Sequence, residues 1–175
     1  MGNHRVQMGR AGGAGKAARF VASSRVQREE TALTIAKLIA GRGTEVWSCQ
    51  AGDSFADAVA MLATRRIGAL PVYDDDGRIA GIFSERDVLY CLHSRGAEAL
   101  ALKVGDVMTA PAITIAPQTP VDEALALMTR RRIRHLPVEA EGRVVGFVSI
   151  GDLVKYRIDR IEAEAEAMRS YIQTA

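Results

Sequence analysis

Two stretches of the chain, residues 53–90 and 119–155, are copies of one sequence pattern. Both contain Arg-Ile-x-x-Leu-Pro-Val, which starts at Arg66 in the first copy and at Arg132 in the second, an offset of 66 residues. Beyond the next turn the offset is 65, because that turn is one residue shorter in the second copy. An internal repeat constrains the architecture more than any local signal. Two copies that differ by one turn residue predict a duplicated unit packed as a pseudo-symmetric pair, not a solenoid.

Each copy predicts the order strand, helix, strand, strand, helix. In the second copy a β-rich run over residues 112–116 ends at Pro117. Thr119 is then expected to cap a helix whose first residue is Pro120. Apolar residues follow at helical spacing, so one face of this helix should pack on a core. In the first copy the corresponding helix is expected to have Asp53 as its cap.

Two strands and a second helix complete each copy. The strands are predicted over residues 69–73 and 78–84 in the first copy, and over 135–138 and 143–149 in the second. This alternation of helices with pairs of strands places the fold in the α/β class, more closely described as α+β.

Each copy leaves its last strand through a Gly-x-x-Ser-x-x-Asp segment, at residues 81–87 and 146–152. Two such segments, each preceded by Arg-Ile-x-x-Leu-Pro-Val, resemble a tandem pair of CBS domains, the Bateman module, in its stand-alone bacterial type. The resemblance covers residues 30–157, most of the chain. It implies two pseudo-symmetric β-α-β-β-α repeats packed as a disc, with two clefts between them.

The resemblance also implies an adenosine-containing ligand in the clefts: AMP, ADP, ATP or NAD, with S-adenosylmethionine possible. In the family the Asp of Ser-x-x-Asp holds the ribose hydroxyls and the Ser contacts phosphate. These roles carry over to Asp87 and Ser84 in one cleft, and to Asp152 and Ser149 in the other. The chemistry agrees, because a carboxylate accepts strong hydrogen bonds from vicinal hydroxyls and a helix start favours an anion. The alternative is that each Asp and Ser only caps its helix.

Further candidate ligand residues lie close to these segments or to the Leu-Pro-Val strands, namely Ile67, Gly68, Ala69, Arg86, Thr114, Arg132, Ile133, Arg134, His135 and Pro137. Apolar walls for adenine are expected from Ile115, Ile133 and Val148, or from Ile67 and Phe83. Arginine suits phosphate because its planar fork meets two oxygens at once. For Arg65, Arg130 and Arg131 a solvated basic helix end is the simpler interpretation.

The two copies differ just before the Leu-Pro-Val strand. The second copy has Arg134 and His135 there, whereas the first has Gly68 and Ala69. This difference predicts that the cleft nearest Arg134 takes the more highly phosphorylated ligand. The cleft beside Gly68 and Ala69 is then expected to be weaker or empty.

The sequence divides into five segments: a basic tail (1–28), a leading helix (29–45), the first repeat (46–102), the second repeat (103–157) and the end of a C-terminal helix (158–175). The tail is basic, has no acidic residue and has few large apolar side chains, so we expect it to be disordered. Such a start also resembles an organelle transit peptide. An ordinary or added tail is the favoured interpretation.

The C-terminal helix is predicted over residues 151–172 and carries an apolar stripe at spacings of three and four: Val154, Ile158, Ile161, Ala165, Met168 and Ile172. A stripe of this length favours packing against the same helix of a second subunit, so we expect a homodimer. The alternative is a helix folded back along its own domain.

The sequence contains neither a paired nucleophile and base nor a metal-ligand cluster, so we do not expect an enzyme. A non-catalytic regulatory protein, acting in trans on an unknown protein target, is the favoured function. The competing hypothesis is a dimeric scaffold whose ligand clefts are vestigial.

Composition narrows the partners and the location. The chain has no run approaching the ~18 apolar residues of a membrane span, so no membrane is expected as partner. Outside the tail, 17 of the 23 basic and all 21 acidic side chains leave a mildly acidic module, which argues against nucleic acid. Binding of nucleic acid through the tail is a third hypothesis and would be strongly salt-dependent. Cys49 and Cys91 form no CxxC motif, and a reducing, cytoplasmic setting is expected.

Overall fold

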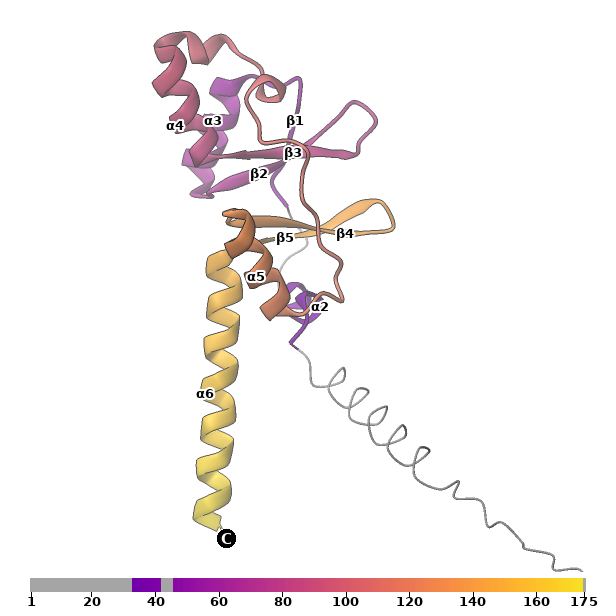
Figure 1. Cartoon of the computed structure of the whole chain (residues 1–175), viewed down its shortest axis with the longest axis vertical. Helices are drawn as coiled ribbons and strands as arrows, with labels where there is room; N and C mark the ends of the chain where they lie inside the picture. Colours follow the sequence, from indigo (N-terminus) through magenta and orange to yellow (C-terminus); the bar gives the residue numbers. More distant parts are fainter. Residues whose placement is uncertain (1–32, 42–45, 175) are drawn as a thin grey trace, which may run out of the picture. The chain divides into compact units, whose positions relative to one another are not determined.

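The computed structural model describes residues 33–41 and 46–174 (Figure 1). In chain order its elements are α2 (Ile35–Ala40), β1 (Cys49–Gln50), α3 (Phe55–Arg65), β2 (Ala69–Tyr73), β3 (Ile79–Ser84), α4 (Glu85–Arg95), the 3₁₀ turns η1 (Gly96–Ala101) and η2 (Val104–Asp106), α5 (Val121–Arg131), β4 (His135–Ala140), β5 (Arg143–Ser149) and α6 (Ile150–Thr174). The predicted basic tail, and residues 29–32 and 42–45 of the predicted leading helix, lie outside the described residues.

The two copies of the repeat fold alike. β2 pairs antiparallel with β3, and β4 pairs antiparallel with β5. The registers correspond, since Leu70 is opposite Phe83 in the first copy and Leu136 is opposite Val148 in the second. Each pair also has a register irregularity at the end of its Leu-Pro-Val segment. The predicted α/β fold with two tandem repeats is therefore confirmed.

The strand predicted over residues 112–116 is wrong as an extended element. Only Ile115 joins the second sheet, through a parallel bridge to Val138. The segment bonds to the strands of both repeats. The amide of Ala112 donates to the carbonyl oxygen of Ala80 in β3 at 3.3 Å, while Ile115 bonds to β4.

The helix caps differ from the prediction by one residue in both copies. Pro120 is the capping residue of α5 and makes no side-chain bond. Thr119, just before it, accepts the amide of Ile35 on its carbonyl oxygen at 3.0 Å. In the first copy Ser54 caps α3, and the carboxylate of Asp53 instead accepts the amide of Gln50, the last residue of β1, at 2.8 Å.

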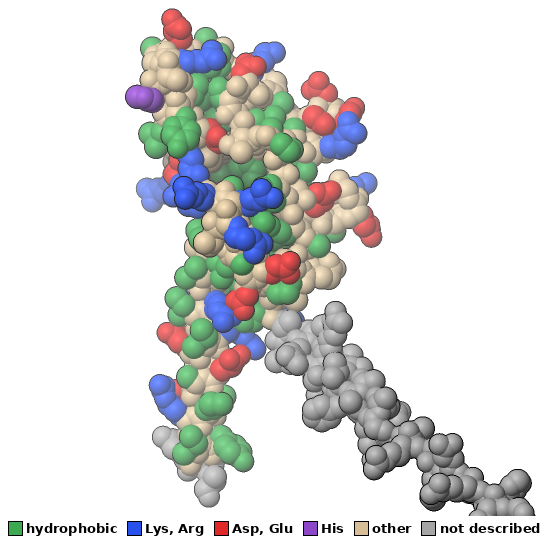
Figure 2. Space-filling view, in the orientation of Figure 1, with side chains coloured by type: hydrophobic (Ala, Val, Ile, Leu, Met, Phe, Trp, Pro, Cys, Tyr) green, Lys and Arg blue, Asp and Glu red, His purple; other side chains and the backbone are tan. Residues whose placement is uncertain are grey.

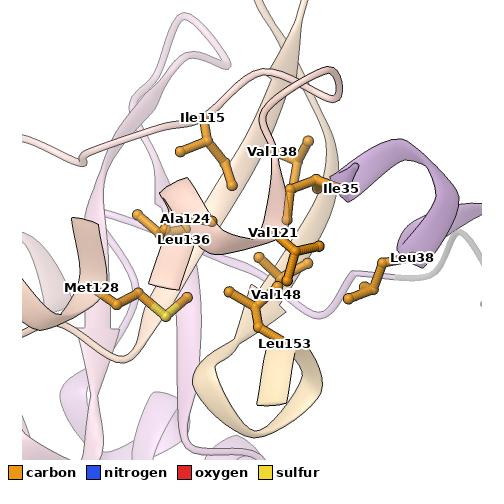
Figure 3. Close-up of a cluster of buried hydrophobic side chains, with 10 residues drawn as sticks. All are labelled: Ile35, Leu38, Ile115, Val121, Ala124, Met128, Leu136, Val138, Val148 and Leu153. Atoms are coloured by element: carbon orange, nitrogen blue, oxygen red, sulfur yellow. The ribbon is translucent and has the colours of Figure 1, made fainter. Parts of the chain in front are cut away.

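Each repeat has its own apolar core, and a segment that precedes the other repeat completes it. Figure 3 shows the core of the second repeat, formed by Ile35, Leu38, Ile115, Val121, Ala124, Met128, Leu136, Val138, Val148 and Leu153. Ile35 and Leu38 come from α2, which precedes the first repeat in the chain. In the same manner Ala99 and Val104, which lie between the repeated stretches 53–90 and 119–155, complete the core of the first repeat. The two repeats are thus interlocked.

Helix α6 begins inside the second repeat and continues past it (Figure 1). Leu153 is fully buried, and Arg157 forms an ion pair with Asp122 of α5 at 2.7 Å. Over residues 158–172 every side chain is exposed except that of Ala165, which is half-buried. The predicted C-terminal helix is confirmed, and it does not fold back along its own domain.

Candidate functional site

Two cavities open at the junction of the repeats. The larger cavity has a volume of about 430 Å³ and is lined by Ile39, Val46, Trp47, Arg66, Ile67, Gly68, Ala69, His135, Val145, Gly146, Phe147, Ser149 and Asp152. The smaller cavity, of about 100 Å³, is lined by Ile82, Ser84, Arg86, Asp87, Thr109, Pro111, Ala112, Ile113, Ile133, Arg134 and His135. Pockets for small ligands usually measure roughly 300–1,000 Å³. Of these two, the larger cavity has the size for a nucleotide.

Each cavity combines the Ser-x-x-Asp segment of one repeat with the start of the Leu-Pro-Val strand of the other. Asp152 of the second repeat shares the larger cavity with Gly68 of the first. Asp87 of the first repeat shares the smaller cavity with Arg134 of the second. His135 lines both. Any ligand held in either cavity would therefore touch both repeats.

The Ser and Asp of each segment are hydrogen-bonded to each other. At the larger cavity, the amide and Oγ of Ser149 donate to Oδ2 of Asp152 at 2.8 and 2.7 Å. At the smaller cavity, the amide and Oγ of Ser84 donate to Oδ2 of Asp87 at 2.8 and 2.6 Å. These bonds cap the first turns of α6 and α4. The capping role considered from the sequence is thus present at both sites.

Asp87 is also bonded to a residue outside its own Ser-x-x-Asp segment. Its Oδ1 accepts the hydroxyl of Thr109 at 2.8 Å, and the residue is only 8% exposed. Asp152 is half-buried and borders the larger cavity. Asp152 is therefore the more accessible of the two carboxylates.

The unequal volumes follow from differences between the repeats. In the repeat alignment Arg86 corresponds to Gly151, and Arg134 corresponds to Gly68. Both arginines line the smaller cavity, where Nη1 of Arg86 also donates to the carbonyl oxygen of Arg132 at 2.9 Å. Gly68 lines the larger cavity without a side chain, and Gly151 lies between the lining residues Ser149 and Asp152.

The imidazole of His135 lies between the repeats and favours its uncharged form. Its ring stacks on that of Phe147, with centroids 5.6 Å apart and planes at 7°. Burial, followed by the charge of Arg134, lowers the pKa of His135, and the carboxylates of Asp152 and Glu85 act in the opposite direction. The net effect favours the uncharged ring where the two cavities meet.

Most of the predicted ligand residues line a cavity. The larger cavity includes Ile67, Gly68, Ala69, His135, Ser149 and Asp152, and the smaller includes Ser84, Arg86, Asp87, Ile133, Arg134 and again His135. Three predicted residues, Thr114, Arg132 and Pro137, line neither cavity. Pro137 is buried within β4, and Arg132 is the C-terminal capping residue of α5.

The family follows from a comparison with known domains. Residues 43–94 and 104–159 each match the model of the CBS domain. The chain belongs to the CBS-domain family. The resemblance stated from the sequence is therefore confirmed, and it places the chain among proteins whose domain pairs are regulatory modules.

Known relatives agree with this assignment. A mitochondrial CBS domain-containing protein of Arabidopsis thaliana is 38% identical over 135 residues, which cover 75% of this chain and 65% of the relative. The crystal structure of a CBS-domain containing protein from Agrobacterium tumefaciens is 36% identical with a TM-score of 0.69, over 72% of this chain and 94% of that one. The chain spans only 27% of an inosine-5'-monophosphate dehydrogenase of Mycobacterium leprae that it also matches.

One structural neighbour was crystallised with adenosine ligands. The CBS domain pair of protein MJ0100, in complex with 5'-methylthioadenosine and S-adenosyl-L-methionine, has a TM-score of 0.62 over 70% of this chain and 98% of that one. Its sequence is 23% identical, so the likeness concerns the fold.

Some of the apolar walls predicted for this CBS pair are wrong. Phe83 and Val148 are fully buried in the cores of their repeats, and Ile115 is only 8% exposed. None of the three lines a cavity. Ile67 and Ile133 do line cavities, the first the larger one and the second the smaller one.

Sequence analysis missed several apolar residues that line the larger cavity: Ile39, Val46, Trp47, Val145 and Phe147. The guanidinium carbon of Arg65 lies 3.7 Å from the centre of the Trp47 ring. The repeat offered one signal, because Trp47 aligns with Ile113, which lines the smaller cavity. No local signal marks Ile39, which reaches the cavity through the packing of α2 on the second repeat.

The volumes argue against the predicted difference between the two CBS clefts. The cleft beside Arg134 is expected from the sequence to take the more highly phosphorylated ligand, yet it measures about 100 Å³. The cleft beside Gly68 and Ala69 was expected to be weaker, yet it measures about 430 Å³. Arginines near a cleft signal affinity for phosphate, but their side chains also occupy the space that a ligand needs.

The described residues contain neither a metal-ligand group nor a membrane-spanning helix. Within residues 33–41 and 46–174, no three His, Cys, Asp or Glu side chains are grouped to hold a metal ion. No helix among these residues has the length and apolar character to cross a membrane.

Proposed function

We propose that this CBS pair is a non-catalytic regulatory module that binds one adenosine-containing nucleotide in its larger cavity. The observation that carries the proposal is a cavity of about 430 Å³ lined by both repeats, with Ser149 and Asp152 at its edge. A ligand there contacts two repeats at once, so it can bias their packing. Such a bias equals the difference in affinity between the two arrangements. An altered surface then acts in trans on a protein target.

Each lining group has a role in this proposal. Asp152 accepts hydrogen bonds from the ribose hydroxyls, and Ser149 at the start of α6 faces phosphate. Arg66 supplies a cation at the same cavity, and Trp47 supplies an apolar surface for adenine. AMP, ADP, ATP and NAD are the favoured ligands. S-adenosylmethionine is retained because a neighbour of the same fold was crystallised with it.

The smaller cavity is proposed not to hold a nucleotide. Arg86 and Arg134 line it, and Asp87 is held by its own chain through Ser84 and Thr109. The expected stoichiometry is therefore one nucleotide per chain.

Isothermal titration with AMP, ADP, ATP, NAD and S-adenosylmethionine tests the proposal. We expect one site per chain for at least one of these ligands. Asp152→Asn should raise the Kd by about 10- to 100-fold, because hydrogen bonds to a charged group contribute about 1.5–3 kcal/mol. The matched control Asp87→Asn removes the same charge at the other repeat and should leave the Kd unchanged. Equal losses in the two variants, or two equal sites in the native protein, would overturn the one-cavity assignment.

A dimeric scaffold with vestigial clefts is the second candidate. The capping bonds of Asp87 and Asp152 favour it, since each carboxylate already has a structural role. Thermal unfolding in the presence of the five ligands separates the candidates. A ligand at 100 times its Kd adds about 2.7 kcal/mol to the free energy of unfolding. If none of the five ligands raised Tm, the dimeric scaffold would be the remaining candidate function.

Assembly and location belong to the same proposal. We propose a homodimer as the working form and the cytoplasm as its location. The mitochondrial name of the Arabidopsis relative defines the competing location. Fluorescent fusions of the full chain and of a chain without residues 1–28 separate the two, because only a targeting segment would make the location depend on those residues.

A further inference from the structure

We propose that α6 forms a parallel, in-register, two-stranded coiled coil with α6 of a second copy of the chain. The inference extends the homodimer of the proposed function by naming its contact surface and orientation. It does not depend on the nucleotide, so the two can fail separately.

The apolar stripe of α6 follows a heptad spacing. Val154, Ile161 and Met168 occupy d positions, and Ile158, Ala165 and Ile172 occupy a positions, with alternating steps of four and three residues. Such an alternation is the seam of a left-handed coiled coil. Most of the seam is uncovered: Ile158 is 49% exposed, Ile161 53%, Met168 72% and Ile172 75%.

The seam lies on a different face of α6 from the one that packs on its own repeat. Leu153 and Tyr156 belong to the core of the second repeat and occupy c and f positions. The seam positions are a and d, so a partner helix could be added without displacing the core contacts. Figure 2 shows hydrophobic side chains along the exposed length of α6.

A partner also accounts for the stability of the helix itself. Of residues 158–172 only Ala165 is half-buried, and the others are exposed. Most helical stability in proteins comes from burial of an apolar face. A second copy of α6 would supply that burial.

The charges beside the seam select a parallel partner. In a parallel pair, each g residue meets the e residue five positions later on the other helix. Arg157 then meets Glu162 of the second copy, and Glu164 meets Arg169. Both contacts join opposite charges, and each occurs twice in the symmetric dimer.

An antiparallel pair of the same helices would juxtapose like charges. Its e positions pair with e positions, which brings Lys155 to Arg169 and Glu162 to its own copy. Its g positions pair with g positions, which brings Glu164 to its own copy. Like charges at an interface suppress the wrong arrangement. The parallel orientation is therefore the one that the sequence of α6 favours.

The same charged groups have partners within one chain. Arg157 lies 2.7 Å from Asp122, Arg169 lies 3.2 Å from Glu166, and Arg160 lies 3.5 Å from Glu164. Exposed pairs of this kind contribute about 0–1 kcal/mol, so they can be exchanged for contacts across the seam. The charges consequently set orientation, while the apolar seam supplies the affinity. With fewer than four heptads and Ala165 at a central a position, the association should be weak.

Disulfide capture in the full chain tests orientation and register. Ile172→Cys at an a position should give a crosslinked dimer under mild oxidation, because a residues meet their own copies in a parallel pair. Ala163→Cys, at the outer f position of the same helix, is the matched control and should remain monomeric. Absence of the Ile172→Cys crosslink, or equal crosslinking in both variants, would overturn the proposal.

Sedimentation equilibrium without nucleotide tests whether the apolar seam of α6 is the contact surface of the dimer. Ile161→Asp should weaken self-association more than tenfold, and Ala165→Ile should strengthen it, because a β-branched residue at a favours two strands. Arg169→Glu should weaken a parallel dimer, whereas it would strengthen an antiparallel one by pairing with Lys155.

An Ile161→Asp dimer as tight as the native one would overturn the proposal. The contact would then lie elsewhere, for example at Leu89 and Tyr90, which are exposed on α4. Nucleotide titration of Ile161→Asp reports on the ligand site separately.

Discussion

The hydroxyl of Thr109 donates a hydrogen bond of 2.8 Å to Oδ1 of Asp87, and this bond joins the segment between the repeats to the start of α4. The backbone reinforces it, since the amide and carbonyl groups of Thr109 and Ile82 are bonded in both directions at 2.9 Å. The segment approaches β3 closely at Gly81, where an added Cβ would lie 2.8 Å from the carbonyl oxygen of Thr109. The segment around Thr109, between the repeated stretches 53–90 and 119–155, is thus packed on the first repeat.

Thr109→Val should lower the free energy of unfolding by about 1–3 kcal/mol, because it leaves a buried carboxylate oxygen without its donor. Thr109→Ser keeps the hydroxyl and is the control. Urea denaturation monitored by circular dichroism measures both variants. If Thr109→Val were as stable as Thr109→Ser, the bond would be of no consequence for the fold.

Gly151→Arg should close the larger cavity in the way that Arg86 narrows the smaller one. A Cβ at Gly151 meets nothing nearer than Oγ of Ser149 at 3.7 Å, so the substitution fits the backbone. We expect nucleotide affinity to fall more than tenfold while Tm stays near the native value. The reciprocal Arg86→Gly opens the smaller cavity and should raise the stoichiometry above one. Native affinity in Gly151→Arg, measured by titration, would place the nucleotide elsewhere.

Local signals predicted much of this fold. The strand expected over residues 69–73 is β2, and the one expected over 143–149 is β5. Both are bounded by turn residues that can be recognised without tertiary information. The repeat then allowed each copy to support the interpretation of the other, including the paired Ser and Asp at the two strand exits.

The features that sequence reasoning missed depend on contacts between distant segments. The bond from Thr109 to Asp87 joins residues 22 positions apart, and no local sequence pattern predicts it. Ile35 completes the core of the second repeat from a position before the first. The cavity volumes depend on where Arg86 and Arg134 direct their side chains, which the repeat alignment does not specify.

Cys49 should be nearly inert as a thiol. It is 4% exposed in the core of the first repeat, and burial, with a smaller effect of the charge of Asp53, raises its pKa to about 12. Because the thiolate is the nucleophile, reaction with Ellman's reagent at pH 8 should be at least about a hundredfold slower than for a free cysteine. Cys91, 6% exposed, is shielded in the same core. Both thiols should react promptly in guanidinium chloride. Rapid reaction of the folded protein would show that this core opens readily.

His135 should make the folded state sensitive to acid. Burial and the charge of Arg134 lower the pKa of His135 below its ordinary value of 6.5. Between the lowered and the ordinary pKa the unfolded chain binds more protons than the folded one, so the free energy of unfolding falls as pH drops below 6.5. From about one pH unit above 6.5 the ring is almost wholly neutral in both states and contributes little pH dependence.

The matched variant is His135→Phe, which keeps an aromatic ring against Phe147 and removes the titrating group. Urea denaturation of both proteins at several pH values between 7.5 and 5 isolates the contribution of His135, because the carboxylates are common to the two. We expect the native protein to lose more stability than His135→Phe as the pH falls. Parallel curves for the two proteins would mean that the imidazole accepts a proton in the folded state as easily as in the unfolded one, and that the junction between the repeats is more open to water than the burial of His135 indicates.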